Sequence, residues 1–266
     1  MRSIVGIATA LNVTALVVGC SSSQTDSAST TSAEASPTST AITGDVTVFA
    51  AASLKSTFTE LGTRFEKDNP GTSVTFNFGG SSDLVAQLTQ GAPADVFTSA
   101  DTNNMTKAVD AGLLTSDPVN FALNTLTIVT PPGNPKGIAS FADLASPGTQ
   151  VVVCAPQVPC GSATEKVEQA TGVALTPVSE ESAVTDVLGK ITSGQADAGL
   201  VYVTDANGAG DKVTAIPFPE SSGAVNTYPI AVLKESTNPA AAQKFVDLVT
   251  GPQGQEVLAA AGFAAP

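Results

Sequence analysis

Apolar positions follow two alternating periods along most of the chain after residue 43. The run DVTVFAA at 45–51 alternates and is β-rich, which predicts a buried strand. Helical spacing of apolar residues from Leu54 to Phe65 then predicts a helix, with Ser53 as its N-terminal cap and Asn69 near its end. The order repeats with strand TSVTFNFG, helix SSDLVAQLTQG, strand ADVFTSAD and helix TNNMTKAVDAGLL. This β-α-β-α alternation predicts a parallel sheet covered by helices.

Two long extended stretches interrupt this order, one at about Phe121 to Thr130 and one at NTYPIAVLK. Between them lie a predicted helix around Phe141 to Leu144, strand TQVVVC, a helix from Ser162 to Thr171, helix SAVTDVLGKITSG and strand AGLVYV; two helices beginning near Pro239 and Pro252 come last. Two α/β blocks separated by two long strands predict two lobes joined by two crossovers, with a cleft between them. We expect 44–122 to form the first part of lobe 1, 123–228 to form lobe 2 and 229–266 to return to lobe 1.

The N-terminal part of the chain has the composition of a targeting segment and a tether. Arg2 precedes a short apolar run that is about the length of a signal peptide, which we place at 1–19. LVVGC resembles the lipobox of bacterial lipoproteins, in which Cys20 would be lipidated; an ordinary cleaved signal with an incidental cysteine is the alternative. The segment 20–43 follows, and 14 of the 23 residues from Ser21 to Thr43 are Ser or Thr. We therefore expect an exported protein, anchored to the outer face of the cell membrane by a flexible tether.

Composition excludes several kinds of chemistry. The chain of 266 residues has no histidine, which rules out a Ser-His-Asp or Cys-His nucleophile and any histidine-containing zinc site. A formal net charge of −13 makes nucleic acid a poor partner, because phosphates require basic side chains to neutralise them. Cys154 and Cys160 form an even pair in an oxidising compartment once Cys20 is lipidated, and a small-loop disulfide is the leading interpretation. A metal site would be incomplete with two thiolates, and the spacing differs from that of a C-x-x-C redox pair.

Five places along the chain are rich in neutral hydrogen-bond donors. They are Ser53 after FAAA, FGGSSDL at 78–84, VPCGSATEK at 158–166, SEESAVTDVL around Ala183 and Val184, and Tyr202 in GLVYVTDA. Four of them are predicted helix starts, where unpaired N–H groups and the helix dipole favour an anion. Each has a plainer interpretation: an ordinary cap, a common Gly-Gly-Ser loop, dipole partners at Glu180 and Glu181, or a packed tyrosine.

Together these places suit a small, fully ionised oxyanion. Their donors are hydroxyls and backbone amides, and an ionic partner is not required if each anion oxygen receives several hydrogen bonds from fixed amides. A site that offers only donors also disfavours protonated anions, which need an acceptor.

The strings TVFAAASL, GSSDLVAQLTQGAPADVFTSAD, VPCGSATEK, AGLVYVTDA and YPIAVL resemble the molybdate-binding proteins of ABC uptake systems, within the type II periplasmic-binding-protein fold. The resemblance covers about Gly44 to Pro266. It implies a monomeric two-lobed receptor that closes over molybdate or tungstate and delivers the anion to a membrane permease, with no cofactor and no direct protein–metal ligand. By matching motifs, side-chain contacts fall on Ser53, Ser81 and Tyr202, and backbone contacts on Cys160 and Val184.

The sequence departs from this family's pattern at two of those positions. Cys160 replaces the small residue usual in its loop, a change that a backbone contact tolerates. Ser182 and Ala183 stand where an acidic residue often precedes the valine that matches Val184.

Other functions stay open on the sequence. A sulfate or phosphate binder of the same fold is the first alternative; phosphate would need an acceptor, for which Asp83, Asp95 and Asp101 are candidates, although Asp83 and Asp101 suit helix starts better. A serine enzyme would lack both histidine and a G-x-S-x-G elbow, which leaves only a Ser-Lys pair. A surface lipoprotein with a structural role would not need glycine-cleared helix starts on both lobes.

Overall fold

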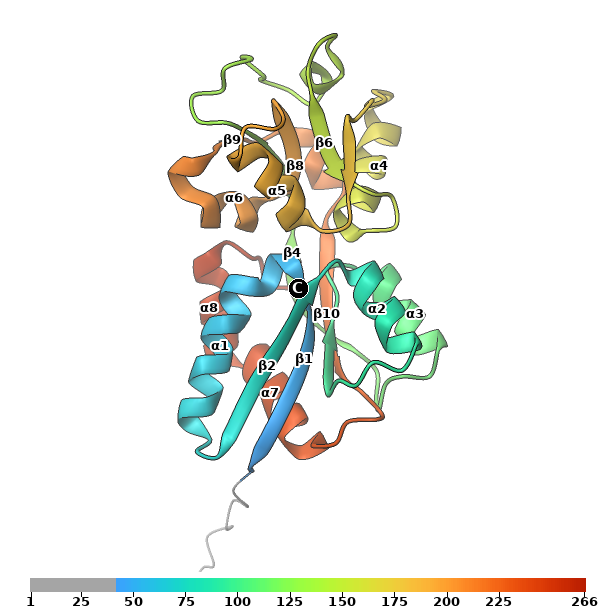
Figure 1. Cartoon of the computed structure of the whole chain (residues 1–266), viewed down its shortest axis with the longest axis vertical. Helices are drawn as coiled ribbons and strands as arrows, with labels where there is room; N and C mark the ends of the chain where they lie inside the picture. The colour runs from blue at the N-terminus through green and yellow to red at the C-terminus, as the bar shows by residue number, and fades with distance from the viewer. Residues whose placement is uncertain (1–41) are drawn as a thin grey trace, which may run out of the picture. The chain divides into compact units, whose positions relative to one another are not determined.

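The computed structural model describes residues 42–266, which form one compact unit with two five-stranded sheets. The first sheet has the strand order β2-β1-β3-β10-β4 and the second has β7-β6-β8-β5-β9. We call the first sheet with its helices lobe 1 and the second lobe 2 (Figure 1). This architecture confirms the predicted two-lobed α/β fold. The predicted signal peptide 1–19, Cys20 and nearly all of the predicted tether 20–43 lie outside the described residues.

Lobe 1 contains the first and last parts of the described chain. Its elements are β1 (Gly44–Ala51), a 3₁₀ turn η1 (Ala52–Leu54), α1 (Lys55–Asp68), β2 (Thr72–Gly79), α2 (Ser81–Thr89), β3 (Val96–Thr98), α3 (Thr102–Asp110), β4 (Val119–Asn124), β10 (Asn226–Val232), α7 (Pro239–Thr250) and α8 (Pro252–Ala261). Helices α1 and α7 lie on one side of the sheet, and α2 and α3 lie on the other (Figure 1).

Lobe 2 contains the middle of the chain. Its elements are β5 (Leu126–Thr130), η2 (Ala142–Ala145), β6 (Val151–Cys154), α4 (Pro159–Thr171), β7 (Ser179–Glu181), α5 (Val184–Thr192), β8 (Ala198–Tyr202), α6 (Val203–Ala209), η3 (Gly210–Lys212), β9 (Thr214–Ile216) and η4 (Pro219–Gly223). The segment predicted as a helix around Phe141 is the short 3₁₀ turn η2, and the sequence reading missed β7, β9 and α6.

The two sheets share one topology. In each, three parallel strands are followed by a strand antiparallel to its neighbours: β10 pairs antiparallel with β3 and β4, and β5 pairs antiparallel with β8 and β9. The parallel strands β1, β2 and β3 run with their carboxyl ends at the same sheet edge. Ligand sites in open α/β sheets lie at that edge, because the helices that follow the strands begin there.

The predicted long strand from Phe121 to Thr130 is wrong in one respect. It is two strands, β4 and β5, separated by Thr125, and they belong to different sheets. The chain returns from β9 to β10 through 217–225, and all of β10 lies in the first sheet. The predicted lobe ranges 44–122, 123–228 and 229–266 stay predictions.

Lobe 1 packs two apolar layers against its sheet. Alternate residues of β1 point to opposite faces, so Val48 joins one buried cluster while Phe49 joins the cluster formed with α2 and α3. Phe245 of α7 packs edge-on against Phe58 and Phe65 of α1, with ring centroids 5.9 and 5.5 Å apart. Such aromatic pairs contribute about 0.5–1.5 kcal/mol beyond the area they bury. Residues 42–266 therefore contain the apolar core that an independently folding unit needs.

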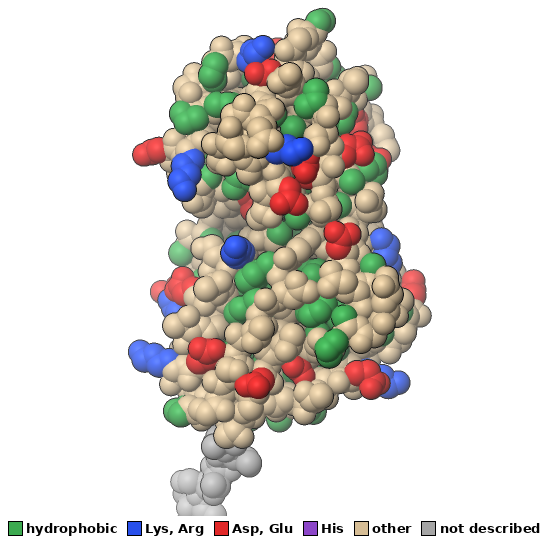
Figure 2. Space-filling model, in the orientation of Figure 1, with side chains coloured by type: hydrophobic (Ala, Val, Ile, Leu, Met, Phe, Trp, Pro, Cys, Tyr) green, Lys and Arg blue, Asp and Glu red, His purple; other side chains and the backbone are tan. Residues whose placement is uncertain are grey.

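Charge is spread over the surface. In the face that Figure 2 draws, acidic and basic side chains lie among uncharged ones and form no basic patch. A search of the helices in residues 42–266 finds none with the length and hydropathy of a membrane span.

Candidate functional site

A small pocket lies where helix starts of the two lobes meet. It is lined by Ala51, Ala52, Ser53, Gly79, Gly80, Ser81 and Ala100 from lobe 1, and by Val158, Pro159, Cys160, Val184 and Tyr202 from lobe 2. All five residues predicted to contact a ligand are among them. The lining residues have no charged side chain, so whatever the pocket holds must be held by neutral groups.

Helix N-termini supply the main-chain donors of the pocket. Helices α2, α4 and α5 begin at Ser81, Pro159 and Val184, and the turn η1 leads into α1 beside Ser53. The first N–H groups of a helix have no carbonyl partner within it, and the helix dipole makes this end positive. Four such ends at one pocket favour an anion without any basic side chain.

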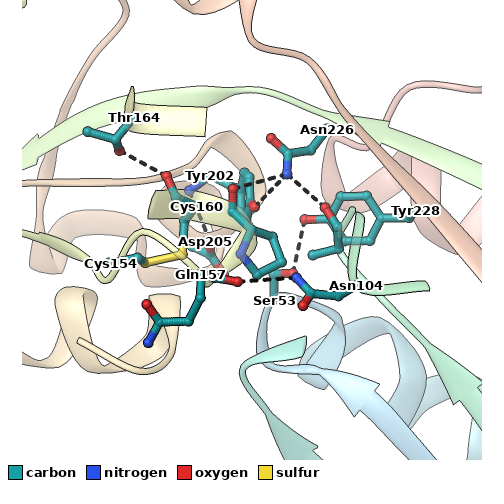
Figure 3. The surroundings of a disulfide bond; sticks show 12 residues. Ser53, Asn104, Cys154, Gln157, Cys160, Thr164, Tyr202, Asp205, Asn226 and Tyr228 are labelled. Carbon is teal, nitrogen blue, oxygen red and sulfur yellow. Dashed lines mark hydrogen bonds between the residues drawn. A yellow bond between two sulfur atoms is a disulfide. The ribbon is translucent and has the colours of Figure 1, made fainter. Parts of the chain in front are cut away.

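Ser53 does not cap a helix, contrary to the sequence prediction. It is the middle residue of η1, and neither η1 nor α1 has a side-chain cap. The prediction failed because the chain inserts a 3₁₀ turn before α1 begins. The Ser53 hydroxyl instead lies 3.0 Å from the hydroxyl of Tyr228, which β10 contributes from the same lobe (Figure 3).

Ser81 is the first residue of α2 and is buried. Its Oγ accepts a hydrogen bond of 3.0 Å from the backbone N–H of Ala100, which follows β3. The hydroxyl of Ser81 therefore keeps its own hydrogen for another partner, since the contact with Ala100 uses only a lone pair.

Tyr202 ends β8 and is 1% exposed. Burial raises the pKa of its phenol well above the usual range, so the group keeps its proton. Its oxygen accepts a hydrogen bond of 3.0 Å from Nδ2 of Asn226 (Figure 3). Its backbone N–H donates to the carboxylate of Asp205 in α6 at 3.1 Å, and burial raises the pKa of that carboxyl to about 7.

The three hydroxyls of the pocket share one arrangement. Ser81 and Tyr202 each accept a hydrogen bond from the protein, and Tyr228 can donate to Ser53 in the same way. Burial also raises the pKa of Tyr228, which keeps that phenol protonated and able to donate. The Ser81 hydroxyl then has its own hydrogen to donate into the pocket, Ser53 has its hydrogen when Tyr228 donates to it, and Tyr202 has Tyr228 as a neutral neighbour that an anion can replace as acceptor. A ligand in the pocket thus meets donors from both side chains and backbone.

A disulfide joins Cys160, near the start of α4, to Cys154 at the end of β6. Gly161, the next residue of α4, packs closely on the backbone that follows β6: a Cβ added to it would lie 2.0 Å from the carbonyl oxygen of Ala155. The start of α4 is therefore held against β6 by a covalent bond and by a close backbone approach. This fixes where the first N–H groups of α4 point.

Val184 is the first residue of α5. The first hydrogen bond of that helix runs from the N–H of Asp186 to the carbonyl oxygen of Ala183. The N–H of Val184 thus precedes the first intrahelical bond. The preceding Ser182 faces lobe 1: an added Cβ on Gly80 would lie 2.0 Å from the Ser182 carbonyl oxygen. The lobes therefore touch at the pocket.

Further hydrogen bonds cross between the lobes. Asn104 Nδ2 donates to the carbonyl oxygen of Gln157 at 3.3 Å (Figure 3), and Asn124 Nδ2 donates to Thr204 Oγ1 at 2.8 Å. With the Gly80 contact, these bonds describe a closed arrangement of the two lobes.

The carboxylates considered as phosphate acceptors lie elsewhere. Asp95 accepts from Thr47 N–H, Ser236 Oγ and Thr237 N–H, and so ties together segments of lobe 1. Asp101 caps α3 and Asp83 lies in the first turn of α2. None of the three lines the pocket. The residues whose roles the sequence analysis missed are Asn226 and Tyr228, which contact pocket hydroxyls from β10; Tyr228 begins the motif YPIAVL, but no role was predicted for either residue.

Comparison with known proteins supports the same kind of molecule. A family model described as bacterial extracellular solute-binding protein matches residues 46–264. The molybdate-binding protein ModA of Mycobacterium tuberculosis (strain H37Rv) is 54% identical over 262 residues, covering 98% of this chain and 99% of that protein. ModA of Escherichia coli K12 is 34% identical over 231 residues, covering 83% of this chain and 89% of that protein.

Solved structures agree at the level of the fold. The periplasmic molybdate-binding protein of Azotobacter vinelandii superposes with a TM-score of 0.72 at 24% identity, covering 83% of this chain and 99% of that chain. The matched family consists of binding proteins and not of enzymes. On the extent of the family match and the identity to its relatives, the chain belongs to the bacterial extracellular solute-binding proteins.

Proposed function

We propose that this protein captures molybdate or tungstate outside the cytoplasm and delivers it to an ABC permease. The names of the relatives and the resemblance in the pocket motifs support this substrate. The observation that carries the proposal is that Ser53, Ser81, Cys160, Val184 and Tyr202 line one pocket with neutral donors from both lobes. Molybdate is a small, doubly charged tetrahedral anion without protons, and it suits a pocket that offers only donors.

Binding would couple to closure of the lobes. In the open state water solvates the donors of each lobe separately, and an anion that enters can bind the serines of lobe 1 first. When lobe 2 closes, the N–H groups at Cys160 and Val184 and the hydroxyl of Tyr202 complete the shell. The anion thus stabilises the closed state because only that state provides donors from both sides, and the permease would recognise the closed state.

Two properties would separate the substrate from common oxyanions. Hydrogen phosphate carries a proton that needs an acceptor, and Asp83, Asp95 and Asp101 lie outside the pocket lining. Sulfate has the same charge as molybdate on a smaller tetrahedron, so its oxygens would reach fewer donors at hydrogen-bond distance. Selection against sulfate therefore rests on size.

The N-terminal features support a location at the membrane surface. A signal peptide at 1–19, lipidation of Cys20 and a Ser/Thr-rich tether at 20–43 would hold the receptor near its permease on the outer face of the cell membrane. A single lipid-bearing receptor needs no second copy for closure, and we propose that it acts as a monomer.

Calorimetric titration of the chain from Gly44 onward with molybdate, tungstate, sulfate and phosphate tests the substrate. We expect tight binding of the first two anions and no displacement by a large excess of the others. Binding of sulfate or phosphate alone would keep the fold and overturn the substrate. Absence of binding of all four would overturn the transport function.

A further inference from the structure

Asn226 lies at the point where lobe 1 meets the hydroxyl of Tyr202. It is the first residue of β10 and is 6% exposed. Its Nδ2 lies 2.8 Å from the carbonyl oxygen of Ala100 in lobe 1, 3.0 Å from Tyr202 Oη and 3.4 Å from the carbonyl oxygen of Pro159 in lobe 2 (Figure 3). One side chain thus contacts both lobes and a residue of the pocket.

The contacts fix which way the amide of Asn226 points. Carbonyl oxygens only accept hydrogen bonds, so the amide atom that faces Ala100 O and Pro159 O must be the NH₂ group. That group has two hydrogens, and the two shorter contacts are those to Ala100 O and Tyr202 Oη. The phenol oxygen of Tyr202 therefore accepts a hydrogen bond and does not donate one to Asn226.

An accepted hydrogen bond decides what Tyr202 can offer to a ligand. A phenol has one hydrogen, and if Asn226 provided an acceptor the hydroxyl would turn toward it and present a lone pair to the pocket. With an N–H at that position, the hydrogen of Tyr202 is directed away from Asn226. The neighbouring hydroxyl of Tyr228 is already 3.0 Å from Ser53 Oγ. Tyr228, whose ring centroid is 6.0 Å from that of Tyr202, is the neutral hydroxyl toward which the Tyr202 hydrogen can turn without a ligand. A charged anion oxygen is a stronger acceptor than this phenol, so the Tyr202 hydrogen would turn to an anion in the pocket.

We propose that Asn226 is a positioning residue that holds the Tyr202 hydroxyl as a donor to the bound oxyanion, and that it does so only when the lobes are closed. The inference rests on the proposed oxyanion function. Asn226 belongs to lobe 1 and Tyr202 to lobe 2, so the bond between them forms only on closure. Closure therefore does more than enclose the anion, because it also sets the direction of a donor.

A double-mutant cycle on the chain from Gly44 onward tests the inference. Its members are the wild type, Asn226→Asp, Tyr202→Phe and the double variant, each titrated with molybdate at pH 8. Asn226→Asp keeps the shape of the side chain but replaces the N–H donor by an acceptor, to which Tyr202 would donate its hydrogen. We expect Tyr202→Phe to weaken binding roughly 10- to 100-fold in the wild type, as for a hydrogen bond to a charged group. In the Asn226→Asp background the same change should weaken binding less than about threefold, because the donor is already lost.

Two further variants separate positioning from a simple link between lobes. Asn226→Ala removes the donor without supplying an acceptor, so Tyr202 can still turn toward the anion, and we expect a smaller loss than for Asn226→Asp. The carboxylate of Asn226→Asp also repels the anion, so the coupling decides the role: a role in packing or in bridging the lobes would leave the effect of Tyr202→Phe unchanged in both backgrounds. Thr204→Val is the matched control: it removes the Asn124–Thr204 bond between the lobes without touching Tyr202. In that background Tyr202→Phe should keep its full effect.

The outcomes are distinct. Equal effects of Tyr202→Phe with and without Asn226→Asp, in proteins with the same circular dichroism spectrum, would overturn the positioning role and leave the proposed function intact. Failure of the wild type to bind any of the four oxyanions would overturn both. Loss of the Tyr202→Phe effect in the Asn226→Asp background, with that effect retained in the Thr204→Val background, would establish the role.

Discussion

The two lobes supply donors of different kinds to one pocket. Lobe 1 contributes the hydroxyls of Ser53 and Ser81, and each is accompanied by a group of its own lobe, the phenol of Tyr228 and the N–H of Ala100. In the proposed site, lobe 2 contributes mainly the main-chain N–H groups at Cys160 and Val184, with Tyr202 as its one hydroxyl. A hydroxyl can be deleted by a single substitution, whereas a main-chain N–H is present in every residue except proline.

Each half of the proposed site is therefore vulnerable to a different kind of substitution. Lobe 1 depends on the identity of its side chains, because its hydroxyls are the donors. Lobe 2 depends on where its backbone is held, through the disulfide of Cys160 and the close approach at Gly161. Substitutions should therefore remove single hydrogen bonds in lobe 1, and displace whole helix starts in lobe 2.

Gly80→Ala should weaken molybdate binding most, because it prevents the two lobes from packing against each other. The added Cβ would lie 2.0 Å from the carbonyl oxygen of Ser182 in the other lobe, and opening the cleft relieves this clash. The backbone of Gly80 has φ −63 and ψ 137, which alanine adopts without strain, so lobe 1 itself should fold. We expect about 100-fold weaker molybdate binding, by calorimetry, at an unchanged melting temperature of the free protein.

Gly189→Ala is the control for that substitution. A Cβ there meets nothing within 4 Å, and it lies inside α5, where alanine is the better helix former. Binding should be unchanged. Small-angle scattering with molybdate should show closure of the wild type and of Gly189→Ala but not of Gly80→Ala, and closure of all three would contradict the role of Gly80.

Ser81→Ala and Ser53→Ala test whether the two serine hydroxyls of lobe 1 bind the anion. Each removes a hydrogen bond to the anion, and we expect roughly 10- to 100-fold weaker binding for either. Ser81→Ala also leaves the N–H of Ala100 without its partner, which should lower the free energy of unfolding by about 1–3 kcal/mol. Ser53→Ala removes a bond between two side chains and leaves no backbone N–H unpaired, so it should lower the free energy of unfolding by less, about 0.5–1.5 kcal/mol. Equal stability of the two variants in urea denaturation would show that the Ala100 contact is not needed for folding.

Removal of the disulfide tests lobe 2. The bond closes a loop with a sequence separation of 6, and replacing both cysteines by serine should lower the free energy of unfolding by about 2 kcal/mol. Affinity should fall by only about three- to tenfold, because the N–H of Cys160 remains and loses only its fixed direction. Cys154→Ser alone frees a thiol but opens the same loop, so it should match the double variant. A loss as large as that of Ser81→Ala would mean that the loop needs the bond to form at all.

Asp205→Asn should change stability without changing affinity. Burial raises the pKa of Asp205 to about 7, whereas an unfolded aspartate titrates near 4. Between these values the folded state binds more protons than the unfolded state, so this carboxyl lowers the free energy of unfolding as pH rises from about 4 to 7. The variant cannot titrate, and its stability relative to the wild type should rise by roughly 1–3 kcal/mol between pH 5 and pH 8. A pH-independent difference between the two unfolding curves would contradict the raised pKa.

Much of the site could be predicted from sequence because its donors belong to local strand-to-helix connections. GGSS before α2, PCG before α4 and the residues around Val184 each mark such a connection, and the structure brings all of them to one pocket. The fold followed from the same alternation of strands and helices. The local pattern did not predict the 3₁₀ turn at Ser53. A serine before an apolar helix predicts an N-terminal cap whether or not a turn lies between them.

The partners of the hydroxyls lie beyond local pattern altogether. Tyr228 lies 175 positions from Ser53, and Asn226 lies 24 positions from Tyr202 and 126 from Ala100, so no local spacing links these partners. Their role depends on how β10 enters the first sheet beside β4. The split of the predicted strand at Thr125 has the same origin, because β-rich residues continue through it while the hydrogen-bonding partners change sheet.

The pairing of β4 with β10 also bears on how such a molecule could arise and be rebuilt. Asn124 and Asn226 are paired partners on these two strands, so the intervening chain leaves and re-enters lobe 1 at adjacent positions. Lobe 2 thus has the topology of an insertion into the sheet of lobe 1. The two points at which the chain leaves and re-enters that sheet are paired neighbours, whatever segment lies between them. A donor lobe from a related receptor could be grafted at these two asparagines, and new specificities could be assembled by recombining halves and not by altering single contacts.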